Sequence, residues 1–344
     1  MPTGIVSDLP EGANVVVLRL RSLGDIVLTT PALSLLKQAR PDLRITVVLA
    51  ASFRGLLDGN TDVSGELIHD GSRWPAFSTL RAIRELKPAL CLDLYGKTWT
   101  SRCTALSGAR FRAGFAHVRE SFSYNVKVPR AQGILGRPED ATVHTAEHLA
   151  STMFHLGLPL SDVPRAKLHA EPQRRERPYA VLHIAALFAT KEWPLDRFRE
   201  VGEFVEKRCG LEPVFISAPG RGDLFSGLGD FTCLDNLTLS ELKSLIAGAQ
   251  LFVGNDSGPA HVAAAFGVPA VAIFGSSNSR IWGPWRTVSA VVETDWDCKP
   301  CKGDRCYEFD EPRCILSVET SQVEKAIDDV LARAGADASV GVTQ

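Results

Sequence analysis

Short apolar runs alternate with longer amphipathic stretches along most of this chain, and the alternation occurs in two successive series. Nearly continuous apolar runs predict strands that are buried on both faces, as in a parallel sheet. In the first series, strands are predicted at residues 15–20, 44–50, 66–69, 89–94 and 110–115, with a helix over 25–39. In the second series, strands are predicted at 179–184, 213–217, 250–253 and 270–274, with helices at 194–208, at 240–247, after Asp256 and at 320–334.

Strands that alternate with helices favour an α/β fold with two doubly wound, Rossmann-like domains and a cleft between them. The proline-bearing stretch between the two series is typical of an interdomain linker. The predicted organisation is a loose leader (1–13), a first domain (14–165), a second domain (178–318), a terminal helix (319–334) and a disordered tail (335–344).

The composition narrows the class of protein. The 344 residues are 45% hydrophobic and 23% charged, which suits two globular domains with their own cores. A formal net charge of −2 argues against a general nucleic-acid binder. No apolar run is long enough to span a bilayer, and the first residues lack the basic and apolar regions of a signal peptide. We therefore expect a cytoplasmic protein whose eight cysteines are thiols or metal ligands rather than disulfides.

The most informative segment, 254–261, reads Gly-Asn-Asp-Ser-Gly-Pro-Ala-His and joins a predicted strand to a helix of small residues. A helix start presents unpaired N–H groups and the positive end of the helix dipole, and both favour a bound phosphate. Small residues at Ser257 and Gly258 let an anion approach the backbone. In the structural alternative, Asn255 and Asp256 only cap the helix.

Four segments in this order resemble the ADP-heptose:lipopolysaccharide heptosyltransferases of glycosyltransferase family 9. They are 19–33 with its Gly-Asp pair, Lys191-Glu192-Trp193-Pro194, 254–261 and Phe274-Gly275-Ser276-Ser277. The resemblance implies a GT-B fold, with the acceptor bound mainly by the first domain and the nucleotide sugar mainly by the second. It also implies an inverting, metal-independent transfer of a heptose or related sugar from an ADP-sugar to a lipopolysaccharide core or similar glycan, with no cofactor.

The resemblance assigns the catalytic base to Asp25, which would take a proton from the acceptor hydroxyl. Ser22 and Gly24 would shape the adjoining turn and contact the substrate through backbone groups. The structural alternative for Asp25 is a helix-capping aspartate.

On the donor side, Lys191 is the predicted cation for the leaving diphosphate, and an ordinary solvated lysine is the alternative. The resemblance assigns the N–H groups near Ser257 and Gly258 to phosphate, and Asp256 to the sugar. His261 follows Gly258 by one helical turn, so we expect its ring to face the same site. A buried structural histidine is the alternative.

One loop departs from the family pattern. Relatives usually carry glycine and a small hydroxyl residue where this chain has Ala185 and Leu187, which lack that flexibility and one hydroxyl donor. Thr190 is a candidate to replace the hydroxyl. Asp223, which follows another predicted strand, is a candidate to bind the ribose hydroxyls.

Four cysteines near the carboxyl end have a spacing that resembles a four-thiolate metal site. They are Cys298, Cys301, Cys306 and Cys314. Because the last interval is irregular for zinc or an iron–sulfur cluster, reduced thiols or a loop-stabilising pair are the alternative. A metal at this position would clamp the loop, and no metal is predicted in the reaction.

Two other functions fit the predicted architecture. A nucleotide-sugar epimerase would need a second strong carboxylate near the cleft, which the sequence does not identify. A non-catalytic nucleotide-sugar-binding protein is supported only by the altered loop at 185–187. An NAD oxidoreductase is disfavoured because no G-x-G-x-x-G segment follows residues 15–20.

The expected partners are a nucleotide sugar and a lipid-linked or core oligosaccharide acceptor, with no nucleic acid. The lipid of such an acceptor places the reaction at the cytoplasmic face of the inner membrane, where we expect weak peripheral association. Arg81, Arg84 and Lys87 are candidates for that contact, and an ordinary solvated helix face is the alternative.

Overall fold

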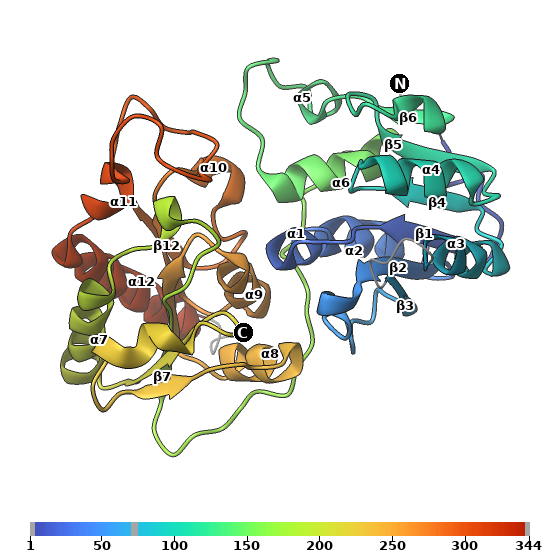
Figure 1. Ribbon diagram of the computed structural model, residues 1–344. Coiled ribbons are helices and arrows are strands. Elements are labelled where there is room, and N and C mark those ends of the chain that lie inside the picture. The colour runs from blue at the N-terminus through green and yellow to red at the C-terminus, as the bar shows by residue number, and fades with distance from the viewer. Residues whose placement is uncertain (1–3, 70–74, 341–344) are drawn as a thin grey trace. The chain divides into compact units, whose positions relative to one another are not determined.

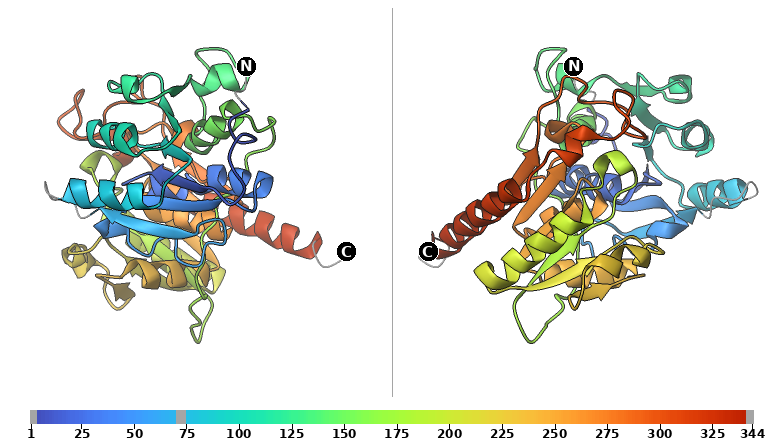
Figure 2. Two further views of the ribbon diagram at one scale, coloured as in Figure 1. Left: turned by 90° about the vertical axis from the view of Figure 1, so that its right-hand side faces the viewer. Right: turned by 60° about the vertical axis from the view of Figure 1, so that its left-hand side comes forward.

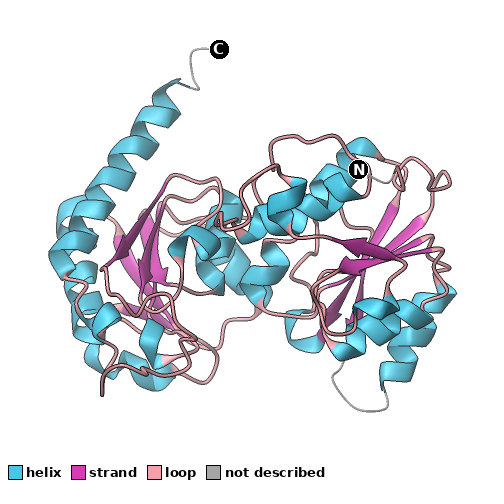
Figure 3. Cartoon of the chain, turned by 90° about the horizontal axis from the view of Figure 1, so that it is seen from above, coloured by secondary structure: helices cyan, strands magenta, loops and turns pink. Residues whose placement is uncertain are grey.

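The computed structural model of the chain describes residues 4–69 and 75–340. It divides into two compact units, Met1–His169 and Ala170–Gln344 (Figure 1). Each unit contains a parallel six-stranded sheet flanked by helices (Figure 3). The strand order is β3-β2-β1-β4-β5-β6 in the first unit and β12-β11-β10-β7-β8-β9 in the second.

The first unit follows the predicted alternation of strands and helices. Its strands are β1 (Asn14–Leu18), β2 (Arg44–Ala50), β3 (Gly65–His69), β4 (Leu90–Asp93), β5 (Phe111–Phe115) and β6 (Val126–Val128). Its helical segments are α1 (Leu23–Val27), α2 (Thr30–Ala39), η1 (Ala51–Phe53), α3 (Pro75–Glu85), α4 (Thr98–Leu106), η2 (Ser121–Ser123), α5 (Ala131–Ile134) and α6 (Thr145–His155). Helix α2 packs against α6, and α3 packs against α4.

The second unit repeats this plan. Its strands are β7 (Tyr179–His183), β8 (Glu212–Ile216), β9 (Thr232–Leu234), β10 (Leu251–Asn255), β11 (Ala270–Phe274) and β12 (Ser289–Glu293). Its helical segments are η3 (Ala189–Lys191), α7 (Leu195–Cys209), η4 (Gly222–Gly227), α8 (Leu239–Ala247), α9 (Gly258–Phe266), α10 (Ser279–Trp282), α11 (Arg313–Leu316) and α12 (Thr320–Val340). Strands β7, β10 and β11 are buried along their whole length, as continuous apolar runs predict.

The amino-terminal segment is docked, so the predicted loose leader is wrong for the described residues 4–13. Ile5, Val6 and Leu9 are buried. The backbone N–H of Val6 donates to the Leu156 carbonyl at 3.0 Å, and the Arg40 guanidinium donates to the Val6 and Leu9 carbonyls. Apolar side chains every few residues, together with one arginine from α2, therefore attach this segment to the first unit.

Two predicted helices have different bounds in the structure. The helix expected over 25–39 is divided into α1 and α2, with Pro31 in the first turn of α2, where the missing proline N–H costs no helical hydrogen bond. The terminal helix, expected to end at Ala334, continues to Val340 as α12. The predicted disordered tail is therefore helical over 335–340, and its last four residues lie outside the described residues.

Docking of the amino-terminal segment 4–13 depends on Gly157, which follows the carboxyl end of α6. Gly157 has φ +116°, and a Cβ there would lie 2.8 Å from the Gly4 Cα. We expect Gly157→Ala to lower the free energy of unfolding by about 1–3 kcal/mol, because it adds backbone strain and displaces the leader. Gly133→Ala is the control, since a Cβ at Gly133 meets nothing within 4 Å. Equal urea midpoints for the two variants would contradict this packing.

Candidate active site

Both sheets have a switch point, where the strand order reverses and the loops after two neighbouring central strands diverge. In the first sheet it lies between β1 and β4, and in the second between β7 and β10. Ligands of doubly wound sheets bind beyond the carboxyl ends of the strands at such points. The charged residues singled out by the sequence follow β1, β7 and β10, so each unit has a candidate site there.

In the first unit, Asp25 lies in the first turn of α1, just beyond β1. One carboxylate oxygen accepts a hydrogen bond from the Arg19 guanidinium. The other accepts from the Ser22 backbone N–H at 3.1 Å and from the Ser22 hydroxyl at 2.8 Å. All three contacts are donors, the arrangement that an ionised carboxylate accepts. Asp25 therefore also supports the helix start, and its side chain is 19% exposed.

A buried network fixes the arginine that contacts Asp25. The Arg19 guanidinium also donates to the Leu94 carbonyl in the loop after β4. The Asp93 carboxylate, fully buried, accepts from the N–H of Gly96 at 2.8 Å and from the Tyr124 hydroxyl at 2.8 Å. Burial raises the pKa of Asp93, and the hydrogen bond from Gly96 opposes that shift. The network therefore sets the loop position that Arg19 requires.

A histidine on α6 adds a neutral group near this arginine. The His148 ring stacks on Phe115 with ring centroids 4.6 Å apart. The His117 ring centroid lies 6.2 Å from that of His148. Burial, and then the positive charges of His117 and Arg19, lower the pKa of His148 to about 4. His148 is consequently neutral at pH 7. Neither Arg19 nor His148 was a predicted site residue, and no local spacing signals the electrostatic effect of Arg19 on His148, because α6 is far from β1 in the sequence.

In the second unit, Asp256 connects two loops of the candidate site. Its carboxylate accepts from the Lys191 ammonium at 2.7 Å and from the Ser277 hydroxyl. Its side chain is 7% exposed and that of Lys191 is 23% exposed. Lys191 and Asp256, which the sequence singles out separately, are thus in direct contact, and Lys191 is not an ordinary solvated lysine. Ser277 was not a predicted site residue, although it belongs to one of the recognised segments.

Asn255 fixes two further segments next to this ion pair. Its side-chain oxygen accepts from the Trp193 N–H at 3.1 Å, and its amide nitrogen donates to the Ile184 carbonyl at 2.8 Å. Asn255 is fully buried. The N-cap of α9 is Ser257, so the alternative in which Asn255 and Asp256 only cap the helix is wrong.

The start of α9 is partly open. Ser257 and Gly258 are half-buried. Pro259 has no N–H and the Ala260 N–H donates to the Ser257 carbonyl at 3.2 Å, so the backbone N–H groups available to an anion at this helix start are those of Ser257 and Gly258. The Ser257 hydroxyl lies 3.0 Å from His183 Nδ1. Burial lowers the pKa of His183 to about 4, so its ring is neutral at pH 7. The helix start thus offers N–H donors to an anion, and a neutral histidine rather than a carboxylate supports Ser257.

Thr190 has a different place from the one predicted. Its hydroxyl is buried, donates to the Gly303 carbonyl and accepts from the Ser276 hydroxyl at 3.0 Å. Gly275 permits this contact, because a Cβ there would lie 2.1 Å from the Thr190 carbonyl oxygen. In this structure Thr190 clamps the loop that contains Gly303 and does not present its hydroxyl to a donor phosphate.

The remaining predicted donor residues differ in exposure. His261 is buried in α9, 4% exposed. Asp223 lies in η4 with a side chain that is 74% exposed, 3.9 Å from Arg221. Arg221 in turn pairs at 3.1 Å with Glu192, the neighbour of Lys191. Asp223 is therefore connected to the Lys191 loop through an arginine, whereas it makes no direct contact with the Lys191–Asp256 pair among the interactions of the described residues.

The cysteine segment contains thiols without disulfides. All eight cysteines, which lie within the described residues, are free. Cys298 and Cys301 are close enough to Cys314 to raise its pKa, after the larger effect of burial. Within residues 4–69 and 75–340, no group of three or more histidine, cysteine or carboxylate side chains is arranged to bind a metal ion. In the same part of the chain, no helix has the length and apolar composition needed to cross a bilayer.

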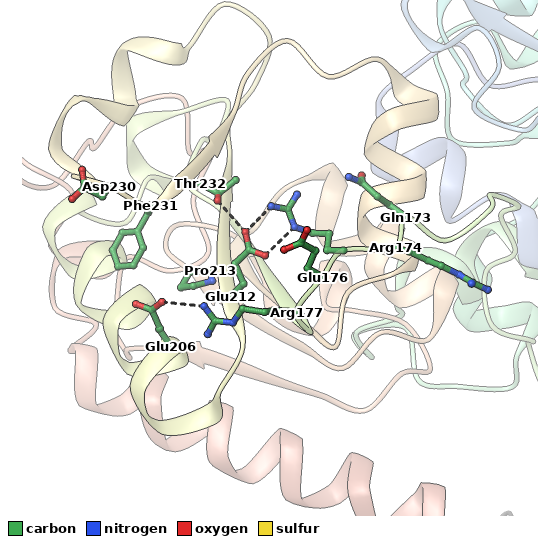
Figure 4. Close-up of a pocket in the computed structure, with 11 residues that line it drawn as sticks. Gln173, Arg174, Glu176, Arg177, Glu206, Glu212, Pro213, Asp230, Phe231 and Thr232 are labelled. Carbon is green, nitrogen blue, oxygen red and sulfur yellow. Dashed lines mark hydrogen bonds and ion pairs between the residues drawn. The ribbon is translucent and has the colours of Figure 1, made fainter.

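A hollow of about 590 Å³ lies at the amino ends of the strands of the second sheet, away from the switch point (Figure 4). It is lined by the first residues of β8 and β9. Two of its arginines are in ion pairs, since Arg175 contacts Glu212 at 2.6 Å and Arg177 lies 3.7 Å from Glu206. Because the hollow is at the amino ends of the strands, we do not assign the reaction to it.

Two doubly wound sheets, each with charged side chains at its switch point, match the GT-B fold. Residues 78–309 match the model of glycosyltransferase family 9 (heptosyltransferase), and the chain belongs to this family. It is therefore a glycosyltransferase. The predicted family and α/β fold class are confirmed.

The chain is similar to named members of this family. Lipopolysaccharide heptosyltransferase 3 of Escherichia coli is 25% identical, with 77% of this chain and 84% of that protein covered. A glycosyl transferase family 9 structure from Veillonella parvula DSM 2008 has a TM-score of 0.78 at 22% identity and covers 93% of this chain and 97% of its own. The E. coli heptosyltransferase WaaC with ADP has a TM-score of 0.70 at 19% identity, with coverages of 92% and 99%.

Buried His183 in the second unit predicts that the stability of the protein depends on pH. The pKa of His183 is about 4 in the folded protein and 6.5 ordinarily, so the unfolded chain binds more protons between these values. Its contribution is fully present above pH 6.5 and is lost as the pH falls to about 4. We expect the free energy of unfolding to drop by up to about 3 kcal/mol across this window, and His183→Gln to reduce the drop. Parallel pH profiles from urea unfolding of the two proteins would contradict the assignment.

Proposed function

We propose that this enzyme transfers a heptose, or a related sugar, from ADP-heptose to a lipopolysaccharide core, with inversion and without a metal or other cofactor. Membership of family 9, the named activity of the E. coli relative and the ADP bound to WaaC support this donor and acceptor. The observation that carries the proposal is the Lys191–Asp256 pair beside the open start of α9, at the switch point of the second sheet.

The second unit supplies the donor contacts in this proposal. The N–H groups of Ser257 and Gly258 bind the diphosphate, and the positive end of α9 favours its charge. Lys191 stabilises the negative charge that develops when ADP leaves. Asp256 orients the lysine ammonium and accepts from a sugar hydroxyl. Asp223 binds the ribose from the more exposed edge of the site.

The first unit supplies the base. Asp25 takes the proton of the acceptor hydroxyl while the hydroxyl oxygen attacks the anomeric carbon, the bond from that carbon to the diphosphate breaks, and ADP departs with the bonding electrons. Attack on the face opposite the departing ADP inverts the anomeric centre. Ser22 and Arg19 retain the carboxylate in position, and Gly24 leaves space beside it.

The lipid of the acceptor determines where the enzyme acts. We place the reaction at the cytoplasmic face of the inner membrane, with the protein attached weakly to the bilayer surface while it uses a nucleotide sugar from solution. The partners are thus a nucleotide sugar and a lipid-linked core acceptor.

Transfer is tested by mass spectrometry of a heptose-deficient core acceptor incubated with ADP-heptose. The proposal predicts a mass increase of one heptose on the acceptor and stoichiometric release of ADP. Isomerisation of the donor without acceptor would identify an epimerase instead. Tight ADP binding with no product from any core acceptor would identify a binding protein.

Replacing the base tests the role of Asp25. We expect Asp25→Asn to reduce kcat by about 10²–10⁴-fold with little change in donor affinity, because the amide keeps the shape of the side chain but cannot take the proton. Asp58→Asn is the matched control, since Asp58 is exposed in the same unit. A kcat for Asp25→Asn equal to that of the control would rule out this base.

Replacing the cation tests the donor site without the acceptor. We expect Lys191→Ala to weaken ADP binding by about 10–100-fold in calorimetry, because a charged hydrogen bond contributes about 1.5–3 kcal/mol. Lys207→Ala is the control, since that lysine is 71% exposed and contacts Glu203 on the same helix. Circular dichroism checks that loss of the partner of Asp256 leaves the fold intact. Unchanged ADP affinity in a folded Lys191→Ala protein would place the diphosphate elsewhere.

A further inference from the structure

Positive charge is concentrated in one segment of the first unit. Residues 75–130 contain ten lysines and arginines but only three acidic residues. The whole chain, by contrast, has 38 lysines and arginines and 40 acidic residues. One of the three acids, Asp93, is fully buried. The net charge of the whole chain is close to zero, but this segment is strongly basic. A basic segment of this kind is typical of contact with an anionic surface.

The same segment exposes three large apolar side chains. Phe77 on α3 is 69% exposed, Leu106 at the end of α4 is 56% exposed, and Phe122 on η2 is 75% exposed. Single exposed apolar residues are ordinary on protein surfaces. Here the three apolar side chains lie near basic residues in the sequence. Their elements are also in contact, since α3 packs against α4 and α4 packs against η2.

Helices α3 and α4 lie side by side against the first sheet (Figure 2, left), and η2 packs against α4. On α3, Phe77, Arg81 and Arg84 repeat at intervals of four and three, which puts them on one helix face. Buried Ile83 faces the sheet. On α4, Arg102 and Leu106 are four residues apart and both exposed. We call the surface formed by Phe77, Arg81, Arg84, Arg102, Leu106, Arg119 and Phe122 the basic–apolar face.

Acidic residues on these elements do not cancel its charge. Glu85 contacts Arg81 at 2.8 Å, but the two side chains are 63% and 82% exposed, so the pair is weak. Glu120 lies 3.9 Å from Arg102 and is itself 12% exposed. Arg84 and Arg119 are exposed as well.

We propose that the basic–apolar face binds the surface of an anionic bilayer, with Phe77, Leu106 and Phe122 inserted at the level of the headgroups. Arginines attract anionic headgroups, and apolar side chains among them bury surface at the acyl boundary. This combination favours a membrane over a nucleic acid, for which exposed apolar side chains of this kind contribute no phosphate contact. The inference rests on the proposed membrane attachment of the enzyme and assigns the residues that make it.

Vesicle co-sedimentation of the full-length protein tests the face. The vesicles contain phosphatidylethanolamine and phosphatidylglycerol at 3:1, with pure phosphatidylcholine vesicles for comparison. We expect binding to the anionic vesicles that weakens in 0.5 M NaCl, and weaker binding to the neutral ones. Arg81→Glu/Arg84→Glu should lower the partition coefficient by about 25-fold, or about fivefold for each basic residue. Phe77→Ser/Phe122→Ser should lower it by about tenfold or more at unchanged charge.

Two control variants lie outside the face. Arg208→Glu/Lys325→Glu makes the same change in net charge on exposed residues of α7 and α12, and Leu160→Ser removes a side chain that is 62% exposed. Both should bind vesicles like the wild type. Equal losses in face and control variants, or binding to RNA in place of vesicles, would overturn the proposal. Transfer to a delipidated acceptor is measured in parallel and should be unchanged in the face variants, so a failure of transfer is distinguished from a failure of docking.

Discussion

The ion pair between Lys191 and Asp256 is the interaction on which the candidate donor site depends. Asp256 is nearly buried at the end of β10, and removing a carboxylate from water is costly unless a cation and donors compensate it. Lys191, from the loop after β7, and Ser277, from the loop after β11, provide that compensation. The buried charge therefore connects loops of three adjacent strands and leaves the ammonium beside the open start of α9.

The first unit uses the same physical arrangement with the signs exchanged. There the cation Arg19 is the less exposed partner, with a side chain that is 11% exposed, and the Asp25 carboxylate is 19% exposed. Asp93 and Tyr124 fix the loop whose Leu94 carbonyl accepts from Arg19. In both units, an inflexible acid–base pair lies where two central parallel strands diverge, so the topology of the sheet positions a charged group without a long binding loop.

The sequence predicts the central strands well because β1, β7, β10 and β11 are buried on both faces and read as continuous apolar runs. It misses the short edge strands β6, β9 and β12, whose partial exposure breaks that pattern. Asp25, Lys191 and Asp256 could be proposed from the sequence because they lie in local motifs. Arg19 and His148 could not, since their electrostatic interaction connects elements over a hundred residues apart. Thr190 was assigned to the donor from its hydroxyl alone, and only the three-dimensional contact with Gly303 reveals its clamping role.

A crystal structure of the enzyme with ADP tests the central claim most directly. We expect the diphosphate to lie within hydrogen-bonding distance of the Gly258 N–H and the Lys191 ammonium, at the carboxyl ends of β7 and β10. A nucleotide bound at the amino ends of the strands, in the hollow beside Arg175 and Glu212, with α9 and Lys191 making no contact to it, would contradict the account.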